Sequence, residues 1–597
     1  MRRPVVTLAL ATLVGLVFAA PSAQAHAELE GTSPTGGAVV KTQPAAVVFR
    51  FGESVEGNFG AVRVFDAKGR RVDDGKVVHP GGRGSEVAVG LRPHLMDGTY
   101  TATYRVISAD SHPVSGGVVF SIGTAGAGSS ETVAGLLAGS NVGALTETAF
   151  GIARGLDYLA IALGVGGLAF LLAAWRPALA DAAGAGTGWP EASTVFAARA
   201  RRLLWLAIGL GVFSGAVGIV LQGATASGTS FWSALDASIV REVLGTRFGT
   251  VWGLRVIAWL SLATVLLAGA GTRAVAVLRP AAVGAAGVAP APAPTRGVLA
   301  ALALPTAFLL VSPALAGHAS TLHPVGVLLA LDVLHVTAMS VWVGGLVMLL
   351  LVLPAATRRL EGSERSRLLA GVLVRFSPIA LTCVAALLAT GVTQALIDMG
   401  GLAPLVHTAF GRAVLIKFVL LLALIGLGAV NRQRVLPALQ GLAAGGEAPG
   451  GPGRLLRRTL RAEVVLAVVV LGVTSALVSY APPKSAASGP FSATKRMGPI
   501  ELQTTIDPAR VGANQLHVYL FDARSGAPYT KTKELTVHAS LPSKRIGPVH
   551  ATMSKAGPGH YVANTVQLVP GGDWRLEVTD RVSDFDEYTT TLKVPVR

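Results

Sequence analysis

Eight apolar segments of about twenty residues each occupy the middle of this chain. A bilayer core requires about 20 apolar residues per helix, and a helix satisfies its own backbone hydrogen bonds where water is absent. Together the segments predict an eight-helix transmembrane bundle within residues 151–480. With 51% hydrophobic and only 14% charged residues, a single soluble domain is excluded. The predicted helices lie near residues 151–174, 203–222, 250–270, 297–316, 324–353, 372–396, 412–430 and 460–480.

The first 25 residues have the pattern of an export signal. Two arginines precede an apolar run, and Ala23-Gln24-Ala25 then provides the small residues of a cleavage site. Cleavage after Ala25 makes His26 the first residue of the mature chain. The alternative is an uncleaved membrane anchor, for which the apolar run is short.

Two regions flanking the bundle alternate apolar and polar residues with the period of β-strands. About seven short runs in residues 26–123 predict an all-β sandwich or barrel. Residues 124–150 are predicted to be a linker, which begins rich in glycine, serine and threonine. Residues 481–597 predict a second, immunoglobulin-like β-sandwich. The expected architecture is a multidomain membrane protein in the order β-domain, helix bundle, β-domain.

The basic residues fall on alternate connections between the predicted helices. If the exported N-terminal domain lies outside, the first, third, fifth and seventh connections lie inside, whereas the outer connections hold only Arg241 and Arg247. The positive-inside rule therefore predicts an inner-membrane protein with both β-domains extracytoplasmic. The net charge of +17 then requires no nucleic-acid partner. The inner basic residues are Arg176, Arg199, Arg201, Arg202, Arg273, Arg279, Arg296, Arg358, Arg359, Arg365, Arg367, Arg432, Arg434, Arg454, Arg457 and Arg458.

The predicted mature N-terminus has the chemistry of a metal site. The free amine and the imidazole Nδ1 of His26 can chelate one ion, and Asp110 and His112 share one face of an extended stretch. Nitrogen-rich tetragonal sets with a carboxylate suit Cu(II). Cys383 is the single cysteine, so disulfide frameworks and cysteine-based zinc or iron–sulfur sites are excluded. A D-x-H pair alone is more often a surface turn, so this prediction depends on His26.

The motifs of this first domain together resemble the bacterial copper-binding family CopC. The resemblance implies that the mature N-terminal histidine and the D-x-H pair bind Cu(II) beside a glutamate, roles that fall on His26, Asp110, His112 and Glu53. Met96 is the only methionine of the domain, so the Met-rich loop of two-site members is missing and a separate Cu(I) site is not implied there. The matching residues are His26, Thr32-Ser33-Pro34, Phe51-Gly52-Glu53, Asp97 to Tyr100 and Ser108 to Gly116.

The fifth predicted helix carries side chains that can bind a metal. Asp332, His335 and Met339 are spaced to line one helix face, and His318 and His323 lie on the outer connection just before it. Ionisable residues in a span are costly and are functional candidates. Imidazole accepts either copper state and thioether sulfur favours Cu(I), so these residues suit a membrane copper path. The alternative is that Met339 only packs and a histidine only caps a helix or forms an internal hydrogen bond.

The helical region resembles CopD, the membrane partner of CopC, and fusions of the two families are known as YcnJ-type copper proteins. This resemblance implies copper movement across the inner membrane, in uptake or resistance. The last domain resembles the appended YtkA-like sandwich, and its His517, His538, His550, Met553 and His560 leave a second copper-handling surface open. The stretches that resemble CopD are Gly317-His318-Ala319, Leu331 to His335, Trp342 to Leu346, Gly411-Arg412 to Lys417, Asn431-Arg432, Arg461 and Glu463.

No motif in the sequence indicates an enzyme. P-loop, metal-ATPase and aspartyl-phosphate signatures are absent, so copper movement is expected to follow a gradient or to couple to another ion. The predicted function is capture of Cu(II) outside the membrane and transport of copper, with a copper chaperone or a reductase as a candidate partner beside the lipid bilayer. Extracytoplasmic copper sequestration or sensing without transport is one alternative. A membrane haem or redox protein is another.

Overall fold

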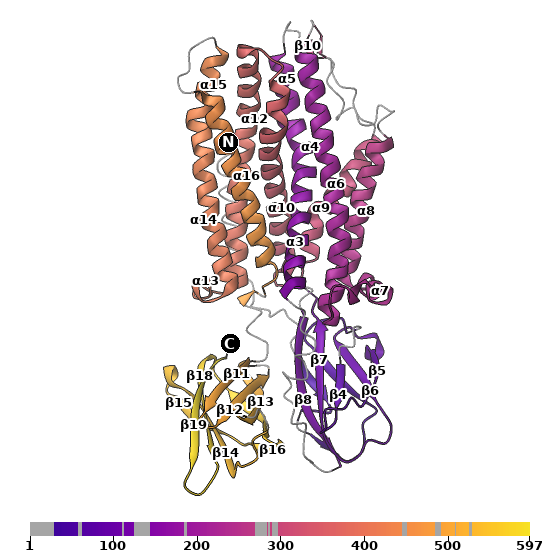
Figure 1. Cartoon of the computed structure of the whole chain (residues 1–597), viewed down its shortest axis with the longest axis vertical. Helices are drawn as coiled ribbons and strands as arrows, with labels where there is room; N and C mark the ends of the chain where they lie inside the picture. Colours follow the sequence, from indigo (N-terminus) through magenta and orange to yellow (C-terminus); the bar gives the residue numbers. More distant parts are fainter. Residues whose placement is uncertain are drawn as a thin grey trace. The chain divides into compact units, whose positions relative to one another are not determined.

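The structure is a computed structural model that contains a helical region and two β-domains (Figure 1). The predicted signal peptide and three predicted ligands, His26, Asp110 and His112, lie outside the described residues. The described residues are 29–36, 38–57, 62–109, 113–123, 144–183, 188–268, 283–284, 287–288, 296–444, 451–480, 482–483, 491–507, 509–524 and 528–596.

The first domain is a β-sandwich, as predicted. Its described strands form two four-stranded sheets, in the orders β1-β3-β6-β5 and β2-β8-β7-β4. The short β2 pairs with β8 in parallel, and the other neighbours are antiparallel. The strands are β1 (Leu29–Ser33), β2 (Val39–Val40), β3 (Ala46–Phe51), β4 (Val62–Phe65), β5 (Asp73–Val78), β6 (Glu86–Leu91), β7 (Gly98–Ile107) and β8 (Pro113–Ile122).

Tyr104 fills the core of this sandwich and explains why one of the motif residues is a glycine. Its ring centre lies 5.1 Å from that of Phe49 and 5.3 Å from that of Phe51. Gly116 faces Tyr104 across the β7–β8 pair. A Cβ atom at Gly116 would lie only 2.5 Å from the Tyr104 hydroxyl oxygen. Glycine fits this position because the tyrosine ring covers it and leaves no room for a side chain.

The helical region confirms the predicted bundle. Seven described helices are long and apolar enough to cross a membrane, and α9 adds a shorter apolar stretch, Ala300–Leu315, at the fourth predicted span. Helix α3 begins at Ala144, within the segment predicted as a linker. The α-helices are α3 (Ala144–Ile161), α4 (Gly167–Phe170), α5 (Arg176–Ala182), α6 (Trp189–Ser227), α7 (Ala237–Gly245), α8 (Arg247–Ala268), α9 (Arg296–Leu315), α10 (Val325–Val347), α11 (Leu353–Thr357), α12 (Gly362–Met399), α13 (Pro404–His407), α14 (Ala409–Val430), α15 (Leu436–Ala443) and α16 (Pro452–Leu477).

Short π-helical turns join several of these helices into longer rods. The turns Ala162–Gly166 and Leu171–Trp175 make α3, α4 and α5 continuous, so that one rod runs from Leu145 to Ala182. The turn Met348–Val352 likewise joins α10 to α11. Two short antiparallel strands of two residues each, β9 (Val283–Gly284) and β10 (Gly287–Val288), lie between α8 and α9 in sequence.

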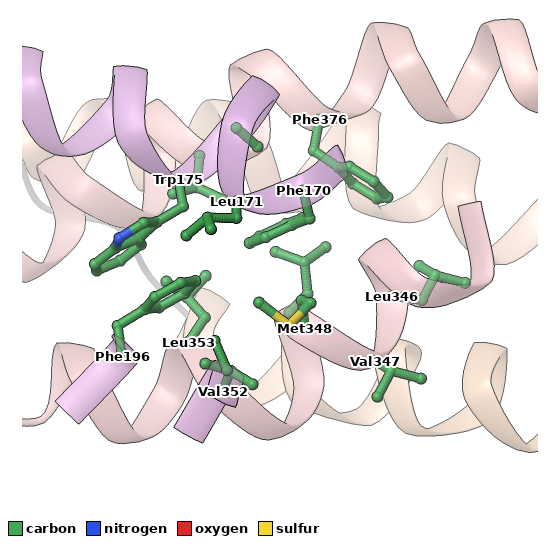
Figure 2. Packing of buried hydrophobic residues seen from close by; sticks show 14 of the residues in the cluster. Phe170, Leu171, Trp175, Phe196, Leu346, Val347, Met348, Val352, Leu353 and Phe376 are labelled. Atoms are coloured by element: carbon green, nitrogen blue, oxygen red, sulfur yellow. The ribbon is translucent and has the colours of Figure 1, made fainter. Parts of the chain in front are cut away.

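Large apolar side chains fill the interior of the bundle. Trp175 and Phe196 stack with their ring planes 2° apart. Figure 2 shows these two rings with Phe170 and Met348 in one apolar cluster, and all four side chains are buried. Met348 therefore serves packing.

Two neighbouring glycines bring α10 against other helices. A Cβ atom at Gly344 would lie 2.2 Å from the Ala162 carbonyl oxygen, and one at Gly345 would lie 2.2 Å from the ring of Phe376. Gly166 approaches α10 in the same way: a Cβ atom there would lie 2.0 Å from the Ser340 carbonyl oxygen. Small residues permit such backbone approach between membrane helices. The Gly344-Gly345 pair therefore positions α10, the helix that carries Asp332 and His335.

Replacing Gly344 by alanine should destabilise the bundle. We expect a loss of at least about 2 kcal/mol, because the added methyl group overpacks a backbone contact. Thermal unfolding of the detergent-purified chain measures the effect. Gly326→Ala on the same helix is the matched control, since nothing lies within 4 Å of a Cβ there. Equal melting temperatures of the two variants would contradict the assignment.

The third domain is a second antiparallel β-sandwich, as predicted. Its described strands form a five-stranded sheet, β11-β12-β13-β17-β16, and a four-stranded sheet, β15-β14-β18-β19. The two sheets enclose a common core that includes Leu516, Val537 and Trp574. The strands are β11 (Phe491–Met497), β12 (Ile500–Asp507), β13 (Gly512–Asp522), β14 (Glu534–Leu541), β15 (Ile546–Ala551), β16 (Ser554–Gly557), β17 (His560–Leu568), β18 (Gly572–Arg581) and β19 (Glu587–Val596).

Asp580 is a buried carboxyl group in this third domain. Its Oδ2 accepts a hydrogen bond of 3.1 Å from the Thr532 hydroxyl, and its Oδ1 has no hydrogen-bond partner among the described residues. Burial raises the pKa of Asp580 and the hydrogen bond from Thr532 lowers it. Burial has the larger effect, so the pKa is about 6. The protonated form is thus favoured by folding. Its stabilising contribution is present below the unfolded pKa of 3.8 and is lost as the pH rises through 6.

The third domain should therefore be more stable at pH 5 than at pH 7.5, by about 1 kcal/mol from this group. Asp580→Asn should remove that difference, because an amide does not titrate in this range. Hydrogen–deuterium exchange of β18 peptides in the intact chain measures it, with Asp584→Asn at an exposed position as the control. A pH dependence that survives in Asp580→Asn would contradict the assignment.

Candidate metal centre

The predicted D-x-H pair lies on the connection between β7 and β8. These strands pair along their whole length, from Gly98 opposite Ile122 to Ile107 opposite Pro113. The last residue of β7 and the first residue of β8 therefore lie side by side at one end of the sandwich. Asp110 and His112 lie outside the described residues, but Ile107 and Pro113 fix both ends of the connection that carries them.

Glu53 lies beside this connection. Its Oε1 accepts a hydrogen bond of 3.3 Å from the Ala109 amide, directly before Asp110. Three residues later, Glu56 exchanges two backbone hydrogen bonds with Ile107, of 2.8 and 3.0 Å. The segment after β3 is thereby attached to the base of the hairpin connection. Glu53 and Ala109, the residue directly before the D-x-H stretch, are far apart in sequence and meet at one end of the domain.

The N-terminal strand leads to the same end of the domain. Leu29, the first residue of β1, pairs with Phe51, two residues before Glu53. His26 lies outside the described residues, three positions before Leu29. The described part of β1 therefore begins at the end where Glu53 and Ala109 meet.

One acidic side chain at this end was missed by sequence reasoning. A Cβ atom at Gly52 would lie 3.1 Å from the Glu30 Oε1, so the Glu30 carboxylate lies beside the Phe51-Gly52-Glu53 motif. Glu30 is the second residue of β1 and lies four residues after His26 in sequence. This closeness to the predicted N-terminal ligand is the only sequence signal that could have identified it. Within the described ranges, no group of three or more His, Cys, Asp or Glu side chains is assembled as a metal site.

In the membrane domain, Asp332 and His335 both face α12. Gln394 Nε2 donates a hydrogen bond of 3.3 Å to Asp332 Oδ1, and His335 Nδ1 lies 2.8 Å from the Thr390 hydroxyl. Thr390 also donates to the Ala386 carbonyl at 2.7 Å, so its oxygen accepts the proton of His335 Nδ1. The lone pair of a neutral His335 then resides on Nε2, the atom that can bind a metal.

Lys417 on α14 completes this polar group. It attracts the Asp332 carboxylate electrostatically. Sequence reasoning singled out Lys417 only as part of a family resemblance, and it missed Thr390 and Gln394 altogether. Their signal is their spacing: the two residues are four apart on α12 and so lie on one helix face.

The other predicted path residues do not join this group. Met339 packs in an apolar cluster with Val343, one turn further along α10, and with Ala162 and Ala467 from other parts of the bundle. His318 begins a short 3₁₀ turn, His318–Ser320, after α9, and exposed His323 precedes α10. Both histidines thus lie on the predicted connection, away from the helix interior.

A buried ion pair connects three helices near Asp332. Arg255 Nη1 on α8 lies 2.5 Å from Asp157 Oδ2 on α3, and Arg255 Nε donates to the Ser312 hydroxyl on α9 at 2.9 Å. The two charged side chains are 2% and 1% exposed. Sequence reasoning missed this pair, although both residues are ionisable and fall inside predicted spans.

At the other end of α14, Asn431 and Glu463 explain part of the resemblance to CopD. Asn431 Nδ2 donates a hydrogen bond of 2.9 Å to Glu463 Oε1, and the Thr459 hydroxyl donates to Asn431 Oδ1 at 2.5 Å. This contact ties α14 to α16. The two matching residues, 32 positions apart, thus form one interhelical contact.

Three family models match successive parts of the chain. A model described as CopC domain matches residues 29–123, one described as Copper resistance protein D-like, N-terminal domain matches 145–291, and one described as Copper resistance protein D matches 370–477. The chain is a fusion of CopC and CopD domains. These matches end before residue 481, so the resemblance of the third domain to YtkA stays a prediction.

Known proteins are similar to this CopC–CopD fusion either over nearly its whole length or over about a sixth of it. Copper transport protein CutJ of Bacillus subtilis is 27% identical over 96% of this chain and 96% of its own length. Protein YobA of Escherichia coli is 30% identical over 17% of this chain and 82% of its own length. The crystal structure of CopC from Methylosinus trichosporium is 28% identical and covers 16% of this chain and 92% of its own, with a TM-score of 0.15.

Breaking the Asp157–Arg255 pair should strongly destabilise the fusion protein. Asp157→Ala leaves a buried guanidinium without its carboxylate, and we expect a loss of about 3–5 kcal/mol. Thermal unfolding in detergent measures it. The control is Glu191→Ala, which breaks an ion pair with Arg359 whose two side chains are each 55% exposed. A similar small effect of both substitutions would show that the buried pair contributes little.

Proposed function

We propose that this CopC–CopD fusion captures Cu(II) outside the cytoplasmic membrane and moves copper across it. The capturing ligands are His26, Asp110 and His112, with Glu53 beside them. One observation carries this proposal: Glu53, the Ala109 amide directly before Asp110 and the start of β1 converge at one end of the first domain. The matches to copper-protein families support it.

The proposed ligand set suits the cupric ion. The amine and imidazole of His26, the imidazole of His112 and the carboxylate of Asp110 supply three nitrogens and one oxygen, a tetragonal set that Cu(II) prefers among the divalent first-row metals. Glu53 contributes by holding the Ala109 amide, which orients the connection that carries two of the ligands. Its role is therefore to position ligands.

Copper would then reach the membrane domain from the outer side. His318 and His323 lie on the connection before α10, and Nε2 of His335 offers a nitrogen within the helix. Asp332, paired with Gln394 and attracted by Lys417, adds a carboxylate one turn from His335. Met339 is surrounded by apolar side chains, so it is a weaker candidate for a Cu(I) ligand.

The proposed orientation places both β-domains outside the inner membrane. It rests on the export signal and on the basic residues of alternate connections. No ATP-binding motif is present, so the movement of copper would depend on its gradient or on a second ion. The proposed role contains no catalysed reaction.

His26→Ala and His112→Ala should each lower the Cu(II) affinity of the full chain by at least about a hundredfold, because each removes a nitrogen ligand. Glu53→Gln should have a smaller effect. A competition titration with a Cu(II) chelator measures the affinity, and intact mass checks that the mature chain begins at His26. The control is His94→Asn, which replaces an exposed histidine of the same domain. Unchanged affinity in both ligand variants rules out the site.

Cell-associated copper separates transport from sequestration. A deletion strain should contain less copper than its parent if the chain imports copper, and restoring the chain should reverse the change. Restoration with His335→Ala should fail while leaving Cu(II) binding by the purified chain intact. An increase in cell copper on deletion would contradict import and favour export or exclusion.

A further inference from the structure

The outer face of one sheet in the third domain carries two adjacent histidines. His538 on β14 pairs directly with His550 on the edge strand β15. Their neighbours Val537, Ala539 and Ala551 are buried in the sandwich core. Because side chains alternate along a strand, the two imidazoles project from the opposite, solvent-facing side. His550 is exposed and His538 is half-buried, so both are accessible from solution.

The separation of the two rings matches that of two imidazoles on one metal ion. Their ring centres are 5.0 Å apart and their planes are inclined by 40°. An ion bound about 2.0 Å from one nitrogen of each ring lies about 3.2 Å from each ring centre, so ligand angles of about 90° to 110° place the centres about 4.5–5.2 Å apart. The observed separation lies within this range.

A carboxylate extends the same row. Glu577 on β18 is the direct partner of His538 on its other side, and it is exposed. Directly opposed side chains of an antiparallel pair have Cβ atoms about 5 Å apart. Glu577 does not form a three-ligand group with the histidines in the present side-chain positions. Its negative charge nevertheless favours a cation on this face.

We propose that His538 and His550 form a surface chelate for a divalent first-row metal ion, which binds Cu(II) most tightly and keeps water in its remaining positions. Two neutral imidazoles on adjacent strands are a bidentate ligand held by backbone hydrogen bonds, and Cu(II) leads the divalent series for nitrogen ligands. This site is separate from the His26 site in the first domain. It goes beyond the proposed function, because it assigns metal binding to the third domain.

The site is tested in the full chain purified in detergent. His26→Ala, Asp110→Ala and His112→Ala together remove the three ligand side chains proposed in the first domain, and Cu(II) alone is titrated into this background. We expect one further Cu(II) per chain, with an electron paramagnetic resonance spectrum that shows coupling to imidazole nitrogen. His538→Ala and His550→Ala should each lower its affinity at least tenfold.

The double variant His538→Ala/His550→Ala distinguishes a chelate from two independent histidines. In a chelate the second substitution has little further effect, because the first already removes one of two coupled ligands. His407→Ala, which removes an exposed histidine in the membrane domain, is the matched control. Circular dichroism confirms that each variant is folded.

Three results would overturn this site. They are an unchanged affinity in both single variants, a loss no larger than that of His407→Ala, and equal, additive losses from the two substitutions. Each of these results leaves the His26 test untouched, since that test uses the chain with an intact first domain. Failure of the first-domain site would in turn leave the titration of the third-domain pair unaffected.

Discussion

The lack of water inside a bilayer is the constraint on which the rest of this structure depends. A charged or polar group there must find its partner within the protein. Arg255 contacts both Asp157 and Ser312 across three helices, and Asp332 has Gln394 and Lys417 as partners. These contacts fix which helices are neighbours, whereas Gly344 and Gly345 allow the backbones to approach closely.

The first domain meets a different requirement, because its predicted ligands come from distant parts of the chain. A β-sandwich solves this by ending several strands at one edge. Glu53 follows β3, the D-x-H stretch connects β7 to β8, and β1 begins opposite Phe51. Strands β7 and β8 are hydrogen-bonded along their length, which fixes both ends of the connection between them. Such a connection can present ligands to an ion while it remains open to solvent.

The histidines proposed to bind metal in the membrane domain and in the third domain are held in two different ways. In the membrane domain, Thr390 accepts the proton of His335 Nδ1, and the lone pair of a neutral His335 resides on Nε2. His538 and His550 instead stand side by side on a sheet whose register sets their spacing. The first arrangement suits passage of an ion, because a single nitrogen releases it readily. The second suits retention, because two nitrogens act together.

The sequence by itself determined the elements and the domain order. Apolar length marks a membrane helix and alternation marks a strand, and both are local properties of the chain. It also identified His335 as a candidate from its spacing on a predicted helix, and the resemblance to CopC implied Glu53. Only the tertiary structure decided that His335 meets Thr390, that Asp157 meets Arg255, and that Met339 packs against apolar side chains. Helix rotation and strand register settle such contacts, and both depend on packing between segments that are far apart in sequence.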